Sequence, residues 1–455
     1  MTRSPAPLSW RGHLKATITL GLPITGSLIA QMAIGLTDTV MVGWYGVQEL
    51  AAVVLATSIF FVFFIVGSGF AMAVMPMVAS AEGAGDRRQV RRVVRMGLWI
   101  SVIFCMGAMP VLWPFERLML LIGQDAEIAA LSQVYMRIAQ WGMFPAMLIM
   151  VLKSFLSAVE RPNWVLWGTI LGALANGLLN YALIFGNWGA PELGIRGAAV
   201  ASVLSASTTF AALALYSMLQ PALRRYDLFS RLWRPDPEAL AEVFRLGWPI
   251  GATMLAEVGL FSASAVMMGW VGTRELASHG IVIQIASMSF MVYLGLANVA
   301  TVRTGRALGR DDRTGIWRAA ATVAGLQLSV AMVMVALFLS LPEFLIGLFL
   351  DLAKPESMAI VAYGAGLLAL AAAFQVVDGA QVVALSVLRG LRDTRVPMLC
   401  AVISYWGIGL PAGWLLAFPL GYGGYGIWSG LVIGLTLAAL SLGSRFAWLF
   451  SRMPG

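Results

Sequence analysis

Long apolar stretches alternate with short polar ones along the whole chain. Twelve of these stretches are long enough to cross a bilayer as helices, since about 20 residues span the hydrocarbon core. This pattern predicts an all-α integral membrane protein with twelve spans. The predicted spans are residues 16–42, 48–80, 93–113, 127–152, 164–185, 197–219, 243–270, 276–302, 317–341, 357–386, 397–418 and 426–449.

The pattern repeats after the sixth span. LGLPI at 20–24 matches LGWPI at 246–250, and MVGW at 41–44 matches MMGW at 267–270, both at a separation of 226 residues. Six spans per half place both halves in the membrane in the same sense, and such parallel repeats are typical of secondary transporters. We therefore predict two lobes that are built as six-helix repeats. The boundaries would be an N-terminal lobe at 1–220, a cytoplasmic linker at 221–242 and a C-terminal lobe at 243–455.

Further pairs at the same separation are Glu49-Leu50-Ala51 with Glu275-Leu276-Ala277, Gly69 with Gly295, and Asp86-Arg87 with Asp312-Arg313. Two prolines, Pro23 and Pro249, also match. Each removes a backbone hydrogen bond and favours a kink, which could act as a hinge or as a bend for packing.

Composition and charge agree with a membrane protein. Hydrophobic residues make up 60% of the chain and charged residues 11%, against about 25% charged in soluble proteins. The net charge of +8 does not indicate nucleic-acid binding, because the basic residues lie in short loops between spans. With the N-terminus inside, 25 Lys and Arg residues are cytoplasmic and 5 are outside, so both termini are expected in the cytoplasm.

Two carboxylates lie at similar depth in the predicted C-terminal lobe. Glu257 follows Arg245 by twelve residues and Asp378 precedes Arg389 by eleven, roughly 18 and 16 Å from the cytoplasmic edge. Because a charge at bilayer depth is costly, it usually faces a protein cavity and has a function. The pair predicts a cation-coupling site for Na⁺ or H⁺; hydrogen bonding for packing alone is the alternative.

The N-terminal lobe contains a third acid, Asp38, roughly 10 Å from the outer edge. Asn176 and Asn180 share one helix face and could form a polar cluster with it, or serve as contacts between helices. At the repeat positions Gln31 corresponds to Glu257, and Ser264 corresponds to Asp38. The acids are therefore not needed to fold the repeat, and each lobe is expected to have its own polar site.

Other polar residues near membrane depth have weaker signals. Lys153 is expected to extend to the inner edge, Arg137 either lines an outer cavity or does the same, and His279 is interpreted as a structural hydrogen bonder. Cys105 and Cys400 lie in separate apolar runs, with no metal-ligand spacing. Aromatic and methionine side chains near the acids could line a pocket for flat organic cations, although core packing is the commoner role: Phe261, Met288, Phe290, Met291 and Tyr293.

Four stretches together resemble one family. They are QMAIGLTDTVMVG at 31–43, NGLLN at 176–180 with APELG at 190–194, the stretch around Glu257, and DGAQVV at 378–383 with LRGLRD at 388–393. With these the chain resembles the multidrug and toxic compound extrusion (MATE) transporters of the NorM type, over essentially its whole length. The resemblance implies a V-shaped pair of bundles that exports organic cations in exchange for Na⁺ or H⁺.

The resemblance also implies roles for single residues. Glu257 and Asp378 match the C-lobe cation acids, and Asp38 matches the N-lobe acid, with Asn176 and Asn180 near it. The chain departs from the family pattern at Phe374, where some relatives have Tyr, and at His279-Gly280, where many have His-Gln. Both departures remove oxygen ligands and weaken an assignment to Na⁺.

We therefore expect a secondary active multidrug efflux antiporter of the bacterial inner membrane, with rocker-type alternating access and a role in antibiotic resistance. Its expected partners are organic-cation drugs and membrane lipid, with no nucleic acid, no cofactor beyond the coupling ion, and a monomeric state. A lipid-linked precursor flippase of the same superfamily is the alternative, but it would need a cationic cavity. A membrane-embedded enzyme is a third reading, which no nucleophile–base pair, metal spacing or phosphate loop supports.

Overall fold

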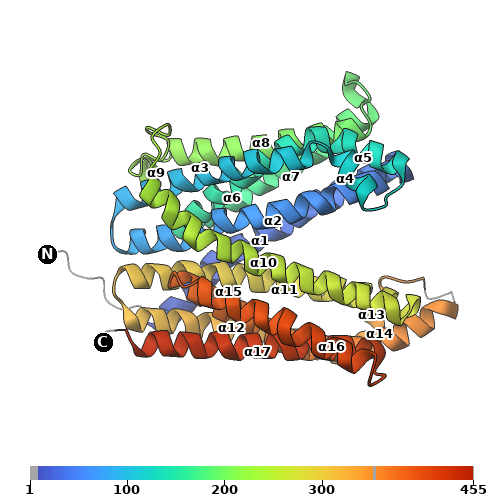
Figure 1. Ribbon diagram of the computed structural model, residues 1–455. Coiled ribbons are helices and arrows are strands. Elements are labelled where there is room, and N and C mark those ends of the chain that lie inside the picture. The colour runs from blue at the N-terminus through green and yellow to red at the C-terminus, as the bar shows by residue number, and fades with distance from the viewer. Residues whose placement is uncertain (1–8, 352–354, 454–455) are drawn as a thin grey trace. The chain divides into compact units, whose positions relative to one another are not determined.

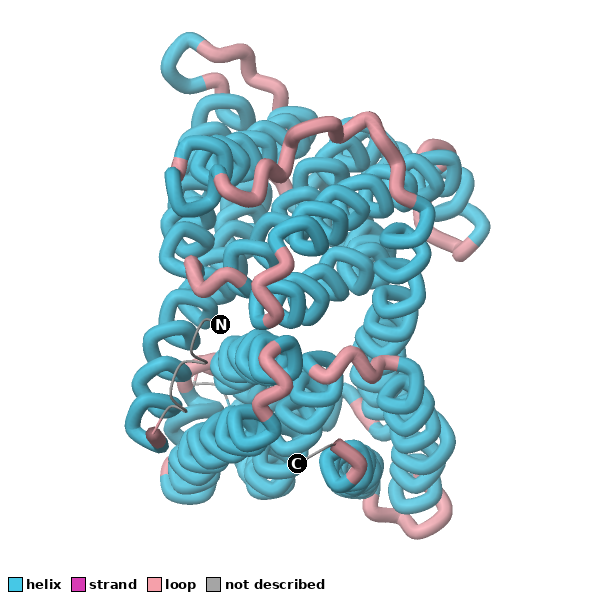
Figure 2. Tube along the Cα trace, turned by 90° about the vertical axis from the view of Figure 1, so that its left-hand side faces the viewer, coloured by secondary structure: helices cyan, strands magenta, loops and turns pink. Residues whose placement is uncertain are grey.

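The computed structural model describes residues 9–351 and 355–453, which form helices joined by short loops, with no strand among them (Figure 1, Figure 2). Within these residues twelve helical segments are long and apolar enough to cross a membrane, which confirms the predicted number. They are α1 (Trp10–Tyr45), α2 (Val47–Gly83), α3 (Arg87–Leu112), α5 to α6 (Ala126–Ala139 and Met143–Ala158), α7 (Pro162–Phe185), α8 (Ile195–Leu219), α10 (Pro237–Val271), α11 (Thr273–Gly309), α12 (Arg313–Ser340), α14 (Pro355–Gly390), α15 to α16 (Arg395–Val402 and Leu410–Ala417) and α17 (Gly423–Ser451).

The sequence repeat is also a repeat of helices. α2 and α11 begin at Val47 and Thr273 and end at Gly83 and Gly309, so both ends are 226 residues apart. A short helix follows the third span of each half, α4 (Phe115–Leu121) and α13 (Pro342–Gly347). The described residues contain one further short α-helix, α9 (Pro221–Arg224), in the segment between the repeats.

Matched aspartates begin two of the matched helices. The carboxylate of Asp86 accepts a hydrogen bond from the backbone N–H of Gln89 at 2.9 Å, and Asp312 accepts one from Gly315 at 2.7 Å. Each carboxylate satisfies an N–H group that the first helical turn leaves without a partner. The matched pairs Asp86-Arg87 and Asp312-Arg313 therefore mark the first residues of α3 and α12 and their N-caps.

Two spans contain irregular turns. The fourth is interrupted by the 3₁₀ turn η1 (Gln140–Gly142), and the eleventh by the π-helical segment η3 (Ile403–Gly409). A π segment holds an extra residue per turn and is frequently found at functional sites. The wider turn rotates the side chains that follow it, and Tyr405 lies inside it.

The chain forms two compact units, divided inside α1 and α10. The N-unit is Leu22–Gly251, and the C-unit contains the described residues of Met1–Gly21 and Ala252–Gly455. The predicted lobe boundaries at 220 and 243 differ from these divisions and stay a prediction. The segment between the repeats belongs to the N-unit, and α10 begins at Pro237, within the predicted linker.

Close contacts explain where the divisions fall. In the C-unit, Arg303 of α11 is 7% exposed and donates to the His13 carbonyl at 2.6 Å and to Thr17 Oγ1 at 2.8 Å. A buried guanidinium needs such acceptors, and they hold the first turns of α1 against α11. In the N-unit, a Cβ atom on Gly69 would lie 2.3 Å from the backbone nitrogen of Gly251. Only glycine permits this approach of α2 to the first half of α10.

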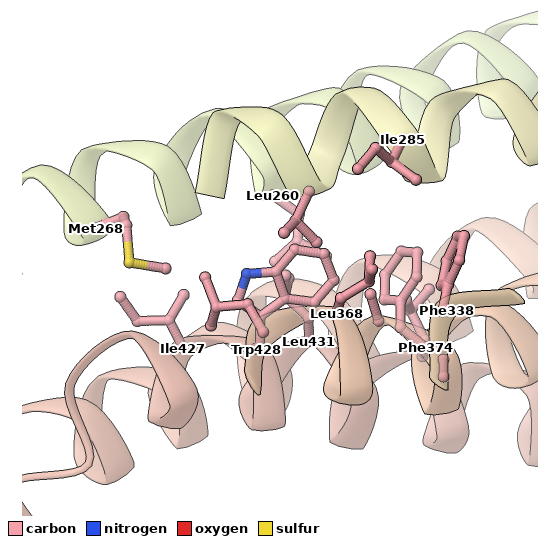
Figure 3. Packing of buried hydrophobic residues seen from close by; sticks show 14 of the residues in the cluster. Leu260, Met268, Ile285, Phe338, Leu368, Phe374, Ile427, Trp428 and Leu431 are labelled. Carbon is pink, nitrogen blue, oxygen red and sulfur yellow. The ribbon is translucent and has the colours of Figure 1, made fainter. Parts of the chain in front are cut away.

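The C-unit core is built around Trp428, which is fully buried (Figure 3). Its indole Nε1 donates to His279 Nδ1 at 3.1 Å, which satisfies the one polar group of the ring and gives His279 the structural role predicted for it. Eight of the side chains packed in this core come from five spans: Leu260, Met268, Ile285, Phe338, Leu368, Phe374, Ile427 and Leu431.

A seam of glycines joins the eleventh and twelfth spans. Gly409 and Gly413 face Gly430 and Gly434, and a Cβ atom on Gly430 would lie 2.3 Å from the Cα atom of Gly413. Glycines four residues apart let two membrane helices approach until their backbones touch. We name Gly409, Gly413, Gly430 and Gly434 the glycine seam.

We predict opposite effects of two alanine substitutions in α17. Gly430→Ala forces a methyl group into the Gly413 backbone and should lower the free energy of unfolding by about 1–3 kcal/mol. Gly443→Ala meets nothing within 4 Å and should raise it by a few tenths to about 1 kcal/mol, because alanine favours the helix. The thermal unfolding midpoints of the two purified variants in detergent measure these effects. Equal midpoints would contradict the close backbone contact at Gly430.

Candidate functional site

Two acids lie together inside the C-unit. Asp378 of α14 is 2% exposed and Glu257 of α10 is half-buried, and the two carboxylates are close enough to interact electrostatically. Oε1 of Glu257 and Oδ1 of Asp378 are buried without a hydrogen-bond partner in the described part of the chain. The structure therefore brings the predicted pair together and leaves oxygens of both available to a cation.

Two tyrosines and an arginine complete the electrostatic surroundings. The hydroxyl of Tyr405, in η3, interacts with both carboxylates, and that of Tyr293, in α11, interacts with Asp378. Both hydroxyls are buried and have no hydrogen-bond partner among residues 9–351 and 355–453. Arg389, in the last turn of α14, interacts with Glu257 and offsets part of its charge.

Amide side chains lie beside Asp378. Gln375 and Gln381 are three residues before and after it and share its helix face, and each has a buried side-chain oxygen that no described group pairs with. The amide of Gln327, from α12, lies so close to Gly379 that a Cβ atom there would be 1.7 Å from its nitrogen. We name Glu257, Asp378, Tyr293, Tyr405 and Gln381 the C-unit polar cluster.

Chemically, the C-unit polar cluster offers hard oxygen donors and two acids in an apolar surrounding. Carboxylate, hydroxyl and amide oxygens are ligands for a hard cation, and either carboxylate can instead take a proton. The described residues contain no group of three or more His, Cys, Asp or Glu side chains that would suit a transition metal. The donor set fits a monovalent cation or a proton.

The N-unit has its own acid site. Asp38 Oδ1 accepts from Asn176 Nδ2 at 2.9 Å and from Asn180 Nδ2 at 2.6 Å, and Oδ2 accepts from Ser202 Oγ at 3.3 Å. The predicted cluster of Asp38, Asn176 and Asn180 is therefore present. Ser202 of α8 and the buried Tyr135 of α5, which interacts electrostatically with Asp38, were not predicted. Nothing in the sequence spacing distinguishes them from other polar residues in the spans.

The prediction for Lys153 is wrong. The Lys153 side chain does not extend to the inner edge, because its ammonium donates to Gln31 Oε1 of α1 at 2.9 Å. Side chains on a helix tilt toward the helix N-terminus. Lys153 lies near the C-terminal end of α6, which is five residues further on, so its aliphatic chain points away from that end. Gln31 is the repeat counterpart of Glu257. At this position the N-unit therefore has the amide of Gln31, bound to the Lys153 ammonium, where the C-unit has the carboxylate of Glu257.

The five predicted substrate-lining residues lie in different surroundings. Met288 is 57% exposed, Phe290 and Met291 are half-buried, and Tyr293 is buried beside Asp378. Phe261 packs edge-on against Phe374 with ring centroids 6.0 Å apart, at the border of the core. Their role in substrate binding stays a prediction. Arg137 stacks over the Trp113 ring at 4.9 Å.

Twelve spanning helices in two repeated sets, with acids inside the spans, define a multi-pass membrane protein of the secondary-transporter type. Comparison with known proteins gives the family. The family model MatE matches residues 23–182 and 249–415, and the chain belongs to this family.

Relatives agree over nearly the full length. The chain is 49% identical over 446 residues to "Probable multidrug resistance protein NorM" of Rhizobium meliloti, which covers 98% of the chain and 95% of the relative. It is 46% identical over 444 residues to the protein of the same name in Agrobacterium fabrum, covering 98% and 96%. Both relatives are named as multidrug resistance proteins and come from bacteria.

Solved structures share the fold. A crystal structure of MATE in the bent conformation matches with a TM-score of 0.88 at 20% identity and covers 98% of this chain and 97% of the other. A MOP superfamily transporter from Pyrococcus furiosus, described as having reversed binding-pocket polarity, matches with a TM-score of 0.84 at 21% identity and covers 97% and 96%. At these identities the likeness concerns the fold.

We predict that Asp38 and Asn180 are energetically coupled. In a double-mutant cycle with Asp38→Ala, Asn180→Ala and the double variant, the coupling energy should be about 1–3 kcal/mol, because the carboxyl oxygen of Asp38 and the amide nitrogen of Asn180 lie 2.6 Å apart in the N-unit. Denaturant unfolding in detergent measures each variant. As the control, Asn180→Ala is combined with Ser58→Ala, whose hydroxyl donates to the Val54 carbonyl of its own helix at 2.7 Å, and the two effects should be additive.

Proposed function

We propose that this protein is a secondary active efflux antiporter of the bacterial inner membrane, with both termini in the cytoplasm. It exports amphipathic organic cations in exchange for Na⁺ or H⁺ by rocker-type alternating access. The observation that carries the proposal is the C-unit polar cluster, where buried carboxylate and hydroxyl oxygens lack partners within the described residues. Groups of this kind in a membrane span are costly unless an ion or a proton satisfies them.

Exchange follows from competition for the two acids. When Glu257 and Asp378 are both ionised, their charge attracts an organic cation, and Arg389 offsets only part of it. A coupling cation that binds the same carboxylates removes that attraction and releases the substrate. Because the coupling cation must bind one conformation better than the other, its gradient shifts the population between them.

The coupling ion of the proposed exchange is either Na⁺ or H⁺. Phe374 and Gly280 have no side-chain oxygen, whereas some relatives have Tyr at the first position and many have Gln at the second. Tyr405, Tyr293 and Gln381 supply oxygens near Asp378 in their place. A proton needs one carboxylate, whereas Na⁺ needs several of these oxygens at once.

The flippase alternative has less support. A pyrophosphate headgroup would bind a cationic site. The C-unit polar cluster is acidic, with Arg389 at its margin, and Lys153 of the N-unit donates to Gln31. A membrane-embedded enzyme is likewise unsupported, because the chain belongs to the MatE family and its relatives are named as multidrug resistance proteins.

We predict that Glu257→Gln and Asp378→Asn each reduce coupled efflux at least about tenfold, because each amide keeps the shape and removes the exchangeable charge. Efflux of a fluorescent organic cation from proteoliposomes is measured with a Na⁺ gradient alone and with a pH gradient alone, which also identifies the coupling ion. The matched control is Glu275→Gln at the first turn of α11, whose carboxylate pairs with Arg274 at 2.6 Å. Normal efflux by both acid variants would refute the proposal.

A further inference from the structure

A pocket of about 890 Å³ lies on the N-unit between the first turns of α3 and the segment that joins α9 to α10. These three helices are labelled in the ribbon diagram (Figure 1). It is separate in sequence from both acid sites. Six arginines line it, against four acidic residues. The arginines are Arg88, Arg91, Arg92, Arg95, Arg231 and Arg234.

Two of the arginines are neutralised by acids of the pocket. Arg92 binds Asp236 through Nε at 2.5 Å and Glu238 through Nη2 at 2.9 Å. The hydrogen bonds from Arg92 hold the pKa of Asp236 below its usual value, so this carboxylate is ionised at neutral pH. Arg91 lies 3.6 Å from Asp227. These ion pairs use three of the four acids and connect α3 to the joining segment.

A third arginine holds the backbone of the joining segment. Arg95 Nη2 donates to the Arg234 carbonyl at 2.7 Å and also to the Arg231 carbonyl. Trp99 Nε1 donates to the Leu232 carbonyl at 2.6 Å. The Arg231 backbone is in the left-handed region at φ +53°, which a residue with a side chain adopts only when its surroundings hold it there. The segment 231–234 is therefore fixed along α3.

The other three arginines have no acid to pair with. Arg88, Arg231 and Arg234 form no ion pair in the described part of the chain, and the remaining acid, Asp86, caps α3. Three guanidinium groups around one concave surface repel one another unless an anion lies between them. Their paired N–H groups match the oxygens of a phosphate diester.

The joining segment also has the character of a membrane interface. Trp233, between two of the unpaired arginines, is 75% exposed. Tryptophan is enriched at the level of lipid headgroups, where its ring is half in apolar surroundings. Trp99, which holds Leu232, lies twelve residues after Arg87, roughly 18 Å along α3 and inside the predicted third span. The α3 residues of the pocket, 88–95, lie at the predicted inner end of the third span, which starts at residue 93.

We propose that this pocket binds the phosphate headgroup of an acidic phospholipid, with Arg88, Arg231 and Arg234 as ligands and Trp233 among the headgroups. The proposal goes beyond the antiport function and does not depend on it, because none of these residues belongs to either acid site. A bound headgroup bridges α3 and the joining segment, and so stabilises the N-unit at the point where the two sequence repeats are connected.

The test is phospholipid binding by the full chain in detergent, measured by native mass spectrometry. Titration with phosphatidylglycerol should give a retained complex in the wild type and roughly 30-fold weaker binding in the double variant Arg231→Gln/Arg234→Gln, since each interfacial basic residue contributes a similar electrostatic increment. The control double variant Arg161→Gln/Arg224→Gln removes two exposed arginines of the N-unit outside the pocket and should bind as the wild type does.

Two further arms make the result decisive. Arg88→Gln is the second variant, to be used if the double variant fails to fold. Arg88 makes none of the contacts described above to the backbone of the joining segment, which come from Arg95 and Trp99, and its substitution should weaken phosphatidylglycerol binding severalfold. Phosphatidylcholine, and inorganic phosphate as the soluble source of the same chemistry, should bind far more weakly than phosphatidylglycerol. Equal binding of the two lipids, equal binding by all variants, or inorganic phosphate binding as tightly as the lipid would each overturn the proposal.

Discussion

The cost of a charge in a hydrocarbon layer governs which side chains this chain can place inside its spans. Every such group has to find a partner, a cavity or a helix end. Asp38 has three donors from α7 and α8, Lys153 has Gln31, and Arg303 has the first turns of α1. Against these satisfied groups, Glu257 and Asp378 differ by keeping buried oxygens without a partner in the described residues. This contrast separates the polar groups that have a partner within the chain from the two acids that are proposed to bind a cation.

The sequence predicts the scaffold well, because the scaffold depends on local rules. Span number follows from apolar length, and the repeat offset of 226 residues marks matched helix ends. The aspartates of the repeat are helix caps, which a reader of the sequence can expect from their place before each helix. The acid pair could also be predicted, since the rise of a helix converts residue number into depth.

The remaining residues of the sites depend on tertiary contacts. Arg389 lies outside the predicted span 357–386, yet α14 continues to Gly390 and the Arg389 guanidinium interacts with Glu257. Tyr405 is one aromatic among many in an apolar run, and nothing in that run indicates the π turn that places it near both acids. The direction of Lys153 follows from helix polarity, but its partner on α1 could not be known before the helices were packed.

The glycine seam has a consequence for how variation in this chain should be interpreted. The four glycines of the seam have no side chain that could bind an ion, yet backbone atoms lie where a side chain would begin. A comparison of many relatives that scored these positions by invariance would rank them with the acids. Their constancy would record the separation of two helix axes. A position that tolerates no substitution therefore need not have a chemical role, and the glycine seam is an example of this in the C-unit.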